Sequence, residues 1–239
     1  MYQSLININS VCISVKMRLS AVLLFCAASL TLAGGVSVRS LLFSSESASN
    51  FVTVQPQKPL DLSAFTLCLR LATELKMEQR EIILFAYRTK YYDELNLWRE
   101  LDGRIGLYLS GDGVFFQMPP LGSLQTHLCI TWDSLTGATS VFMDGKKSLT
   151  KIYQKRHNVR SGGQIIIGQD PDEYLGGFDA NQSFVGEISD INLWSNVLPD
   201  TVIKAMADNG NTVQTGDVID WSVANLEVTG QVNVVNRDM

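Results

Sequence analysis

The sequence predicts an all-β fold, an antiparallel sandwich, and three observations carry that prediction. Short runs rich in β-branched and aromatic residues follow one another closely from residue 65 onward. Turn pairs such as Asp112-Gly113 and Asp144-Gly145 separate them, and Asp-Gly is a strong hairpin signal. Helical patterns do not alternate with the runs, as they would in a parallel α/β fold.

The expected strands share apolar or alternating patterns bounded by turn residues. They cover residues 65–71, 81–87, 106–110, 114–118, 127–132, 140–143, 164–167, 184–194, 218–221 and 226–235. One short helix is expected over 199–207, where Pro199 and Asp200 suit a first turn. Val202 and Met206 share one face of that helix, and Asn209-Gly210 ends it.

Composition excludes several classes of protein. The chain has 239 residues, of which 46% are hydrophobic and 18% charged, so it is not intrinsically disordered. A formal net charge of -5 argues against a nucleic-acid binder with a broad basic surface. The chain contains neither an internal repeat nor a low-complexity linker, which favours one domain over residues 36–239.

The first 33 residues have the layout of a secretory signal peptide. A short basic start at 17–20 precedes an apolar run at 21–33, which small residues close. The run is too short to span a membrane, so no transmembrane anchor is expected and the mature protein is predicted to be secreted and extracellular. Residues 1–16 are either an upstream in-frame start or an extension of the signal.

The chain has four cysteines. Cys12 and Cys26 leave with the predicted signal peptide, so Cys68 and Cys129 have one possible pairing. An oxidising compartment favours a disulfide between them. Closing so long a loop contributes about 4 kcal/mol in the chain-entropy description.

Oxygen-bearing side chains concentrate at residues 170–182. Four carboxylates and two amides lie there, around the flexible pair Gly176-Gly177. Ca²⁺ takes six to eight oxygen ligands, which only a tightly turning loop can supply from one stretch. The loop is not an EF-hand, because Tyr174 and Asn181 stand where ligands are required. The alternative interpretation is a solvated acidic loop without a metal. The acidic pair Asp93-Glu94, taken on its own, is interpreted as part of a turn.

Residues 127–134, His-Leu-Cys-Ile-Thr-Trp-Asp-Ser, closely resemble the pentraxin signature His-x-Cys-x-Ser/Thr-Trp-x-Ser. The resemblance extends to 65–69, 166–169, 185–188 and 192–194, and it covers nearly all of 36–239. It implies a flattened, lectin-like jelly-roll sandwich with one helix over one face, assembled as a cyclic homopentamer. It also implies two Ca²⁺ ions per subunit on the opposite face, where they bind phosphate-bearing ligands.

Carried over by position, the resemblance implies a set of metal ligands. They are Asp93, Glu94, Asp170, Pro171 through its carbonyl, Asp172, Asp179 and Gln182. The family usually has Asn at the position of Glu94, and commonly Glu where this chain has Asp170 and Asp179. Every position keeps an oxygen, so calcium binding is expected. So many like charges in one patch repel one another without a cation.

The ligand implied by the resemblance is phosphocholine, whose phosphate meets the calcium ions. The family's choline-contacting Phe and Glu are not cleanly present. Trp98 could face the quaternary ammonium and Asp112 could supply the charge. Arg99 would oppose choline, but alternation places it on the strand face opposite Trp98. The resemblance thus implies a calcium-dependent pattern-recognition protein of innate immunity, of acute-phase type, with complement-type partners.

Two alternatives use the same architecture. One is a calcium-dependent carbohydrate lectin with a different pocket. The other is a jelly-roll glycosidase, which would carry alternating acids of the form Glu-x-Asp-x-x-Glu on one strand. The nearest run, Glu187-Ile188-Ser189-Asp190, fails that pattern, and neither histidine sits in a nucleophile motif, so we expect no enzyme.

One modification signal stands apart from these motifs. Asn181-Gln182-Ser183 is an N-glycosylation sequon. A glycan there would crowd Gln182, so we expect the sequon to be unoccupied.

Overall fold

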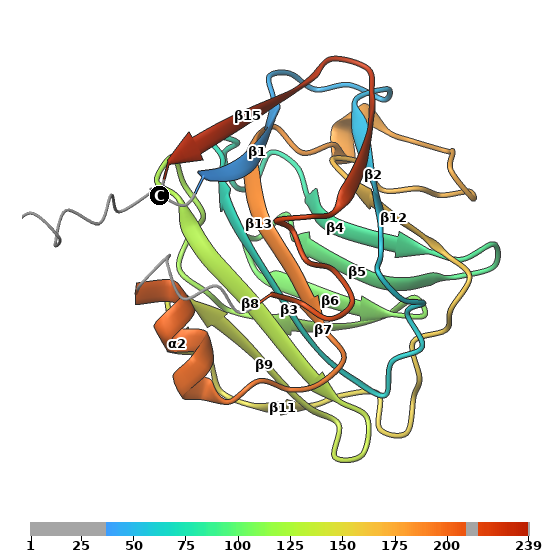
Figure 1. Ribbon diagram of the computed structural model, residues 1–239, viewed down its shortest axis with the longest axis vertical. Coiled ribbons are helices and arrows are strands. Elements are labelled where there is room, and N and C mark those ends of the chain that lie inside the picture. The colour runs from blue at the N-terminus through green and yellow to red at the C-terminus, as the bar shows by residue number, and fades with distance from the viewer. Residues whose placement is uncertain (1–36, 209–214, 239) are drawn as a thin grey trace, which may run out of the picture. The chain divides into compact units, whose positions relative to one another are not determined.

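The computed structural model describes residues 37–208 and 215–238, which form two packed antiparallel sheets (Figure 1). The predicted signal segment, 1–33, lies outside the described residues. The first sheet has eight strands in the order β10-β9-β8-β3-β13-β1-β15, with β11 also pairing with β9. The second has seven in the order β14-β2-β12-β4-β5-β6-β7. The predicted all-β antiparallel sandwich is confirmed.

The strands of the first sheet are β1 (Ser37–Phe43), β3 (Ala64–Ala72), β8 (Thr126–Asp133), β9 (Ala138–Met143), β10 (Lys146–Lys147), β11 (Lys151–Ile152), β13 (Gly186–Trp194) and β15 (Val232–Asp238). Those of the second are β2 (Phe51–Gln55), β4 (Ile82–Arg88), β5 (Asp93–Arg99), β6 (Ile105–Leu109), β7 (Asp112–Phe116), β12 (Gln164–Ile167) and β14 (Asn225–Thr229). The helical elements are α2 (Asp200–Asp208) and the 3₁₀ turn η1 (Ala180–Gln182).

Strand alternation places the core between the sheets. On β3, Leu67 and Leu69 belong to the large central core, whereas Cys68 belongs to a second cluster on the outer face. On β5, Leu95 and Leu97 point into the same central core, and Trp98 belongs to an outer cluster. Each sheet therefore has an outer face of its own, available for a helix or a site.

Two expected strands differ from the structure. Residues 226–235 are not one strand: the chain turns at Gly230, whose φ is +76°, and passes from β14 in one sheet to β15 in the other. Residues 218–221 make a single bridge, Ile219 to Leu193, instead of a strand. The apolar pattern of 218–221 reflects burial against the core rather than pairing.

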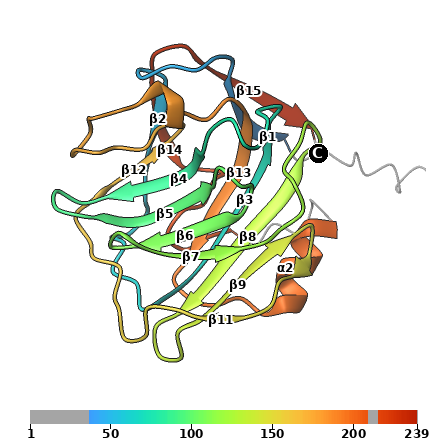
Figure 2. The same ribbon diagram turned by 180° about the vertical axis from the view of Figure 1, so that it is seen from behind.

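Helix α2 packs on the outer face of the first sheet (Figure 2). Its buried residues Ile203 and Met206 contact a cluster that includes Cys68, Cys129 and Phe142. Arg70 Nη2 donates to the carbonyl oxygen of Met206 at 2.7 Å and ties the helix to β3. The predicted helix and its position over one face are confirmed, while its predicted end at Asn209-Gly210 lies outside the described residues.

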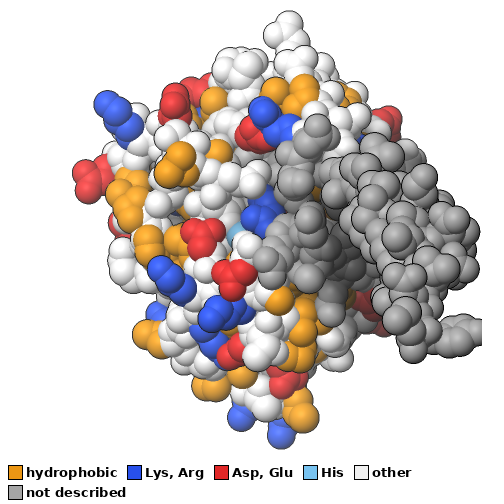
Figure 3. Space-filling view, turned by 60° about the vertical axis from the view of Figure 1, so that its left-hand side comes forward, with side chains coloured by type: hydrophobic (Ala, Val, Ile, Leu, Met, Phe, Trp, Pro, Cys, Tyr) orange, Lys and Arg blue, Asp and Glu red, His pale blue; other side chains and the backbone are white. Residues whose placement is uncertain are grey.

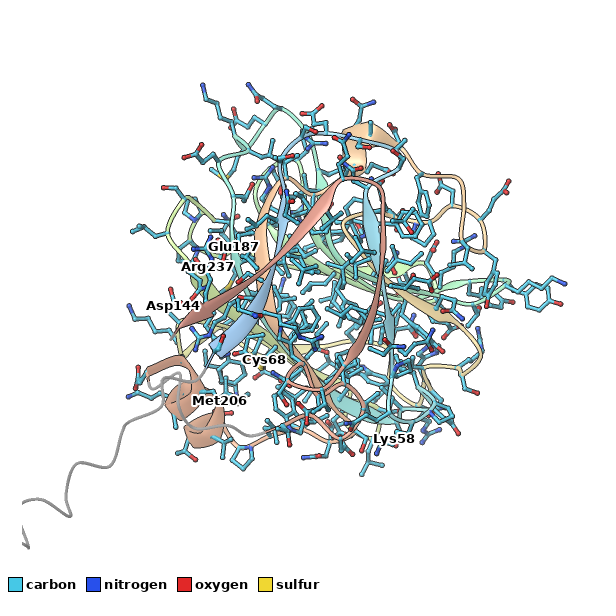
Figure 4. The ribbon with its side chains drawn as sticks, turned by 45° about the horizontal axis from the view of Figure 1, so that its top comes forward. Lys58, Cys68, Asp144, Glu187, Met206 and Arg237 are labelled. Carbon is cyan, nitrogen blue, oxygen red and sulfur yellow. A yellow bond between two sulfur atoms is a disulfide. The ribbon has the colours of Figure 1, made fainter. Side chains whose placement is uncertain are left out.

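The disulfide joins Cys68 to Cys129, which lie opposite each other on the paired strands β3 and β8. The predicted pairing is confirmed. Both cysteines are at least 98% buried beneath α2, and Figure 4 shows Cys68 close to Met206. The bond therefore pins the sheet at the place where the helix docks.

Acidic and basic side chains are interspersed on the face that Figure 3 shows, without a broad basic patch.

Among the described residues, none of the helices has the length and apolar character needed to cross a membrane.

Candidate functional site

Asp170 is the centre of the acidic site. It follows β12 of the second sheet and is only 7% exposed, whereas α2 packs on the first sheet. Asn96 Nδ2, from β5, donates to its Oδ1 at 2.9 Å. Burial, and then the charges of Asp93 and Asp172, raise the pKa of Asp170 to about 7. The fold thus brings three of the predicted ligands into one electrostatic cluster.

The loop that carries most of the predicted ligands is held by an aromatic contact and folded by a tight turn. Phe178 packs on Phe51 of β2, with ring centroids 4.8 Å apart. Glu173 and Gly176 exchange backbone hydrogen bonds of 3.1 Å in a tight turn. Gly177 has φ +71°, and a Cβ there would lie 2.8 Å from the Cβ of Asp172. A glycine is needed at 177 because the loop folds back closely on Asp172 there with a positive φ.

Asp179 precedes the 3₁₀ turn η1, and Gln182 is the last residue of that turn. The Asp179 carboxylate accepts from the backbone N–H of Asn181 at 2.9 Å, which caps the turn. Gln182 Nε2 lies 3.4 Å from Glu81 Oε1, whose charge also acts on Asp170. The Oε1 of Gln182 is buried and has no hydrogen-bond donor. A buried oxygen without a donor is costly, so it indicates a missing partner.

The acidic pair at the start of β5 is divided by the fold. Asp93 is partly exposed, forms an ion pair with Arg88, and acts on the pKa of Asp170. Glu94 is fully buried and points elsewhere: its Oε1 is 2.7 Å from Arg160 Nη1 and its Oε2 accepts from the Arg160 backbone N–H at 3.0 Å. The structure therefore does not bring Glu94 to the cluster. Regular alternation would place Glu94 on the same face as Asn96, but the pairing of β5 with β4 shifts register between Leu95 and Asp93, so the usual alternation does not hold at Glu94.

The remaining implied ligand, Pro171, is buried between Asp170 and the exposed Asp172. Two further residues belong to the cluster and were missed in the sequence: Asn96 and Glu81. The sequence could have indicated Asn96, because it is an amide at an outward position of an otherwise apolar strand. The sequence gives no indication of Glu81, because this residue precedes β4 and only the tertiary fold brings it near the loop.

The chemistry of this donor set fits calcium. It consists of carboxylate and amide oxygens, the ligands that Ca²⁺ prefers. Like charges surround a buried carboxyl group, and a buried amide oxygen lacks a partner. Among the described residues, the one group of three potential ligands within 4.8 Å of one another is Cys68, His127 and Cys129. Its two sulfurs are bonded to each other, so this group is a disulfide with a histidine beside it and not a metal site.

The two residues expected to contact choline lie apart. Trp98 is on the outer face but only 8% exposed, packed in a cluster with Ile83, Ala86 and Ile166. It pairs with Gly106, whereas Asp112 pairs with Leu109, three residues farther along β6.

The immediate contacts of these residues differ as well. The Asp112 carboxylate accepts from Gln154 Nε2 at 3.1 Å. Arg99, as expected, does not share the face of Trp98: it is fully buried and donates to the carbonyl oxygens of residues 75, 76 and 80.

Comparison with known proteins identifies the class. The model of the Pentaxin family matches residues 39–236. The chain is 50% identical over 201 residues to a C-reactive protein of Danio rerio, covering 83% of this chain and 89% of that protein. It is 45% identical over 207 residues to a Pentraxin fusion protein of Xenopus laevis, covering 85% of this chain and 49% of that longer protein.

The fold has a matching solved structure. The heptameric SAP-like pentraxin from Limulus polyphemus superposes with a TM-score of 0.72 at 22% identity, covering 82% of this chain and 94% of that one. The protein therefore belongs to the pentraxin family. Pentraxins are non-enzymatic recognition proteins, which sets aside the glycosidase alternative. The family also identifies the chain as a pattern-recognition protein of innate immunity.

Proposed function

We propose that this protein is a secreted, calcium-dependent recognition protein that binds phosphate-bearing ligands, such as phosphocholine on microbes or damaged membranes. The observation that supports this most is the cluster around Asp170. There a buried carboxyl group stands among like charges and the amide oxygen of Gln182 lacks a donor. A cation would remove both costs at once.

Two Ca²⁺ ions per subunit are proposed, which would supply positive charge for the phosphate oxygens. The candidate ligands are Asp93, Asp170, Pro171 through its carbonyl, Asp172, Asp179 and Gln182, with Glu81 added. Asn96 positions Asp170 by donating to Oδ1. Arg88 pairs with Asp93 and offsets part of the negative charge. Glu94 is withdrawn from the proposed set, because Arg160 and Ser110 already contact its carboxylate.

Phosphate recognition is better supported than choline recognition. Trp98 forms part of the floor beneath the loop together with Phe178, and little of its ring is available to an ammonium group. Asp112 lies farther along the sheet and contacts Gln154. We therefore assign ligand selectivity to the phosphate, and keep Trp98 and Asp112 as candidate contacts of the remaining headgroup.

Assembly and partners follow from the family. A homopentameric ring is proposed. The Limulus polyphemus protein is heptameric, so the number of subunits in this protein has to be measured. Complement-type partners would meet the face that carries α2, because ligand occupies the opposite face. Sizing of the native protein by light scattering determines the number of subunits.

The full chain, secreted from eukaryotic cells, would be applied to phosphocholine resin with Ca²⁺ and eluted with chelator. Retention with calcium and release by chelator are expected. Asp172→Asn should lose retention, while Asp208→Asn, an exposed acid on α2, should keep it. Retention that chelator does not reverse would contradict the proposal, and calcium titration of the same samples gives the ion stoichiometry.

A calcium-dependent carbohydrate lectin is the second candidate, and exposed tyrosines favour it. Tyr91, Tyr92 and Tyr174 are 74%, 48% and 44% exposed on the two segments that carry the acidic cluster. Aromatic rings of this kind stack on sugars as well as on other apolar faces. Binding to a panel of neutral glycans, competed by phosphocholine or not, separates the two ligand classes.

A further inference from the structure

Asn181-Gln182-Ser183 is the one N-glycosylation sequon in the whole sequence. Such a sequon receives its oligosaccharide in the secretory pathway from a lipid-linked diphosphate donor. The asparagine Nδ2–C1 bond forms as the bond between C1 and the diphosphate oxygen breaks. Nδ2 loses one proton, and the lipid diphosphate departs. The modification therefore needs a secreted chain and a side chain that solvent can reach in the final fold.

Asn181 meets the structural requirement. It is exposed in η1, and its Nδ2 donates to Asp179 Oδ1 at 3.0 Å. A primary amide carries two hydrogens, and a glycan replaces only one of them. The hydrogen bond to Asp179 is therefore compatible with a sugar on the same nitrogen.

The side chain of Gln182 turns away from that of Asn181. Its Nε2 faces Glu81 and its Oε1 is buried, whereas Asn181 is exposed. A sugar on Asn181 therefore does not crowd Gln182, and the physical reason for expecting an empty sequon is gone. Ser183 is 1% exposed and its hydroxyl donates to the Ala180 carbonyl oxygen at 2.6 Å. Transfer must accordingly take place before this loop folds.

We infer that Asn181 carries an N-linked oligosaccharide that stands at the rim of the acidic cluster, outside the metal ligands. The inference rests on the secretion included in the proposed function. It adds a covalent group to the ligand-binding side of the sandwich. There the sugar keeps a crowded surface at a distance, while a small ligand can still reach the site.

The test is the mass of the full chain secreted from eukaryotic cells, measured before and after peptide N-glycosidase treatment. A loss of mass is expected, together with conversion of Asn181 to aspartate in the peptide map. Asn181→Gln should abolish the change. Ser183→Thr, which keeps both sequon and buried hydroxyl, should retain it, and so should Asn225→Gln, an exposed amide outside any sequon.

Secreted protein of unmodified mass would overturn the inference while leaving secretion intact, whereas failure of secretion would instead contradict the proposed function. A second measurement addresses the place of the glycan. Calcium affinity of the glycosylated natural chain and of the Asn181→Gln variant, which lacks the sugar without adding a carboxylate, should agree within about twofold. A tenfold difference would show that the sugar covers the metal ligands and would overturn the assigned position.

Discussion

Glu94 and Arg160 form an ion pair in which only one partner is buried. Glu94 is 0% exposed, while the Arg160 side chain is 51% exposed and lies 2.7 Å away through Nη1. The guanidinium carbon of Arg160 is also 4.5 Å from the ring centroid of Tyr92. A single arginine thus neutralises a buried carboxylate and joins the chain near residue 160 to the start of β5.

Removing Arg160 should destabilise the protein without removing calcium. Arg160→Ala leaves a buried carboxylate without its cation, and we expect the free energy of unfolding to fall by about 3 kcal/mol. Urea unfolding measures this, with Lys155→Ala, an exposed neighbour, as the control. The double variant Glu94→Gln/Arg160→Ala should recover part of the loss. An equal loss in single and double variants would show that the charge of Glu94 is not the cause.

Calcium should stabilise the native state through Gln182. A ligand that binds only the folded state raises the apparent stability by mass action. Calcium should therefore raise the melting temperature of the natural chain, and Gln182→Leu should reduce that increase while changing the calcium-free melting temperature little. Gln164→Leu, which removes an amide that donates to Tyr174, is the matched control. The expectation is contradicted if both variants keep the full calcium response.

His127 should make acid conditions destabilising. Burial and then the charge of Arg70 lower its pKa to about 3, so the folded state keeps the ring neutral. The unfolded chain binds a proton near pH 6.5, and stability therefore falls as pH decreases from 6.5 toward 3.

The loss from His127 is about 1.4 kcal/mol for each pH unit in that interval. Burial raises the pKa of Asp190 and Glu100, so these two groups stabilise the folded state as the pH falls. The contribution of His127 must therefore be isolated by comparing the natural chain with a His127 variant. His127→Gln should be about 2 to 3 kcal/mol more stable, relative to the natural chain, at pH 4.5 than at pH 7.5. Urea unfolding at both values measures the difference, and a constant difference would refute the prediction.

The disulfide should resist reduction until the protein unfolds. Cys68 is 2% exposed and Cys129 is 0% exposed, both covered by α2. Reductant alone should therefore release no thiols from native protein, while reductant with denaturant should release two. Replacing both cysteines with alanine should cost about 4 kcal/mol, because the bond closes a segment of 61 residues. Thiol labelling of native protein within minutes would show that α2 does not protect the bond.

Part of the candidate site could be predicted because it lies in one short stretch of chain. Four of the predicted ligands are close in sequence: Asp170, Asp172, Asp179 and Gln182. Gly177 allows the loop to fold back so that they can lie near one another. The division of Asp93 from Glu94 could not be predicted. Register shifts in the pairing of β5 with β4, and a cation 66 residues away, decide which of two adjacent carboxylates faces the loop.

The sequence by itself determined the sandwich class, the family, the single helix and the disulfide. These depend on periodicity, on turn residues and on a signature within one strand, all of which are local. Only the tertiary structure decided that Glu94 pairs with Arg160, that Asn96 and Glu81 join the acidic cluster, and that Gln182 turns away from Asn181. Those relationships join strands and loops distant in sequence, and side-chain direction there is decided by burial and charge pairing rather than by neighbours along the chain.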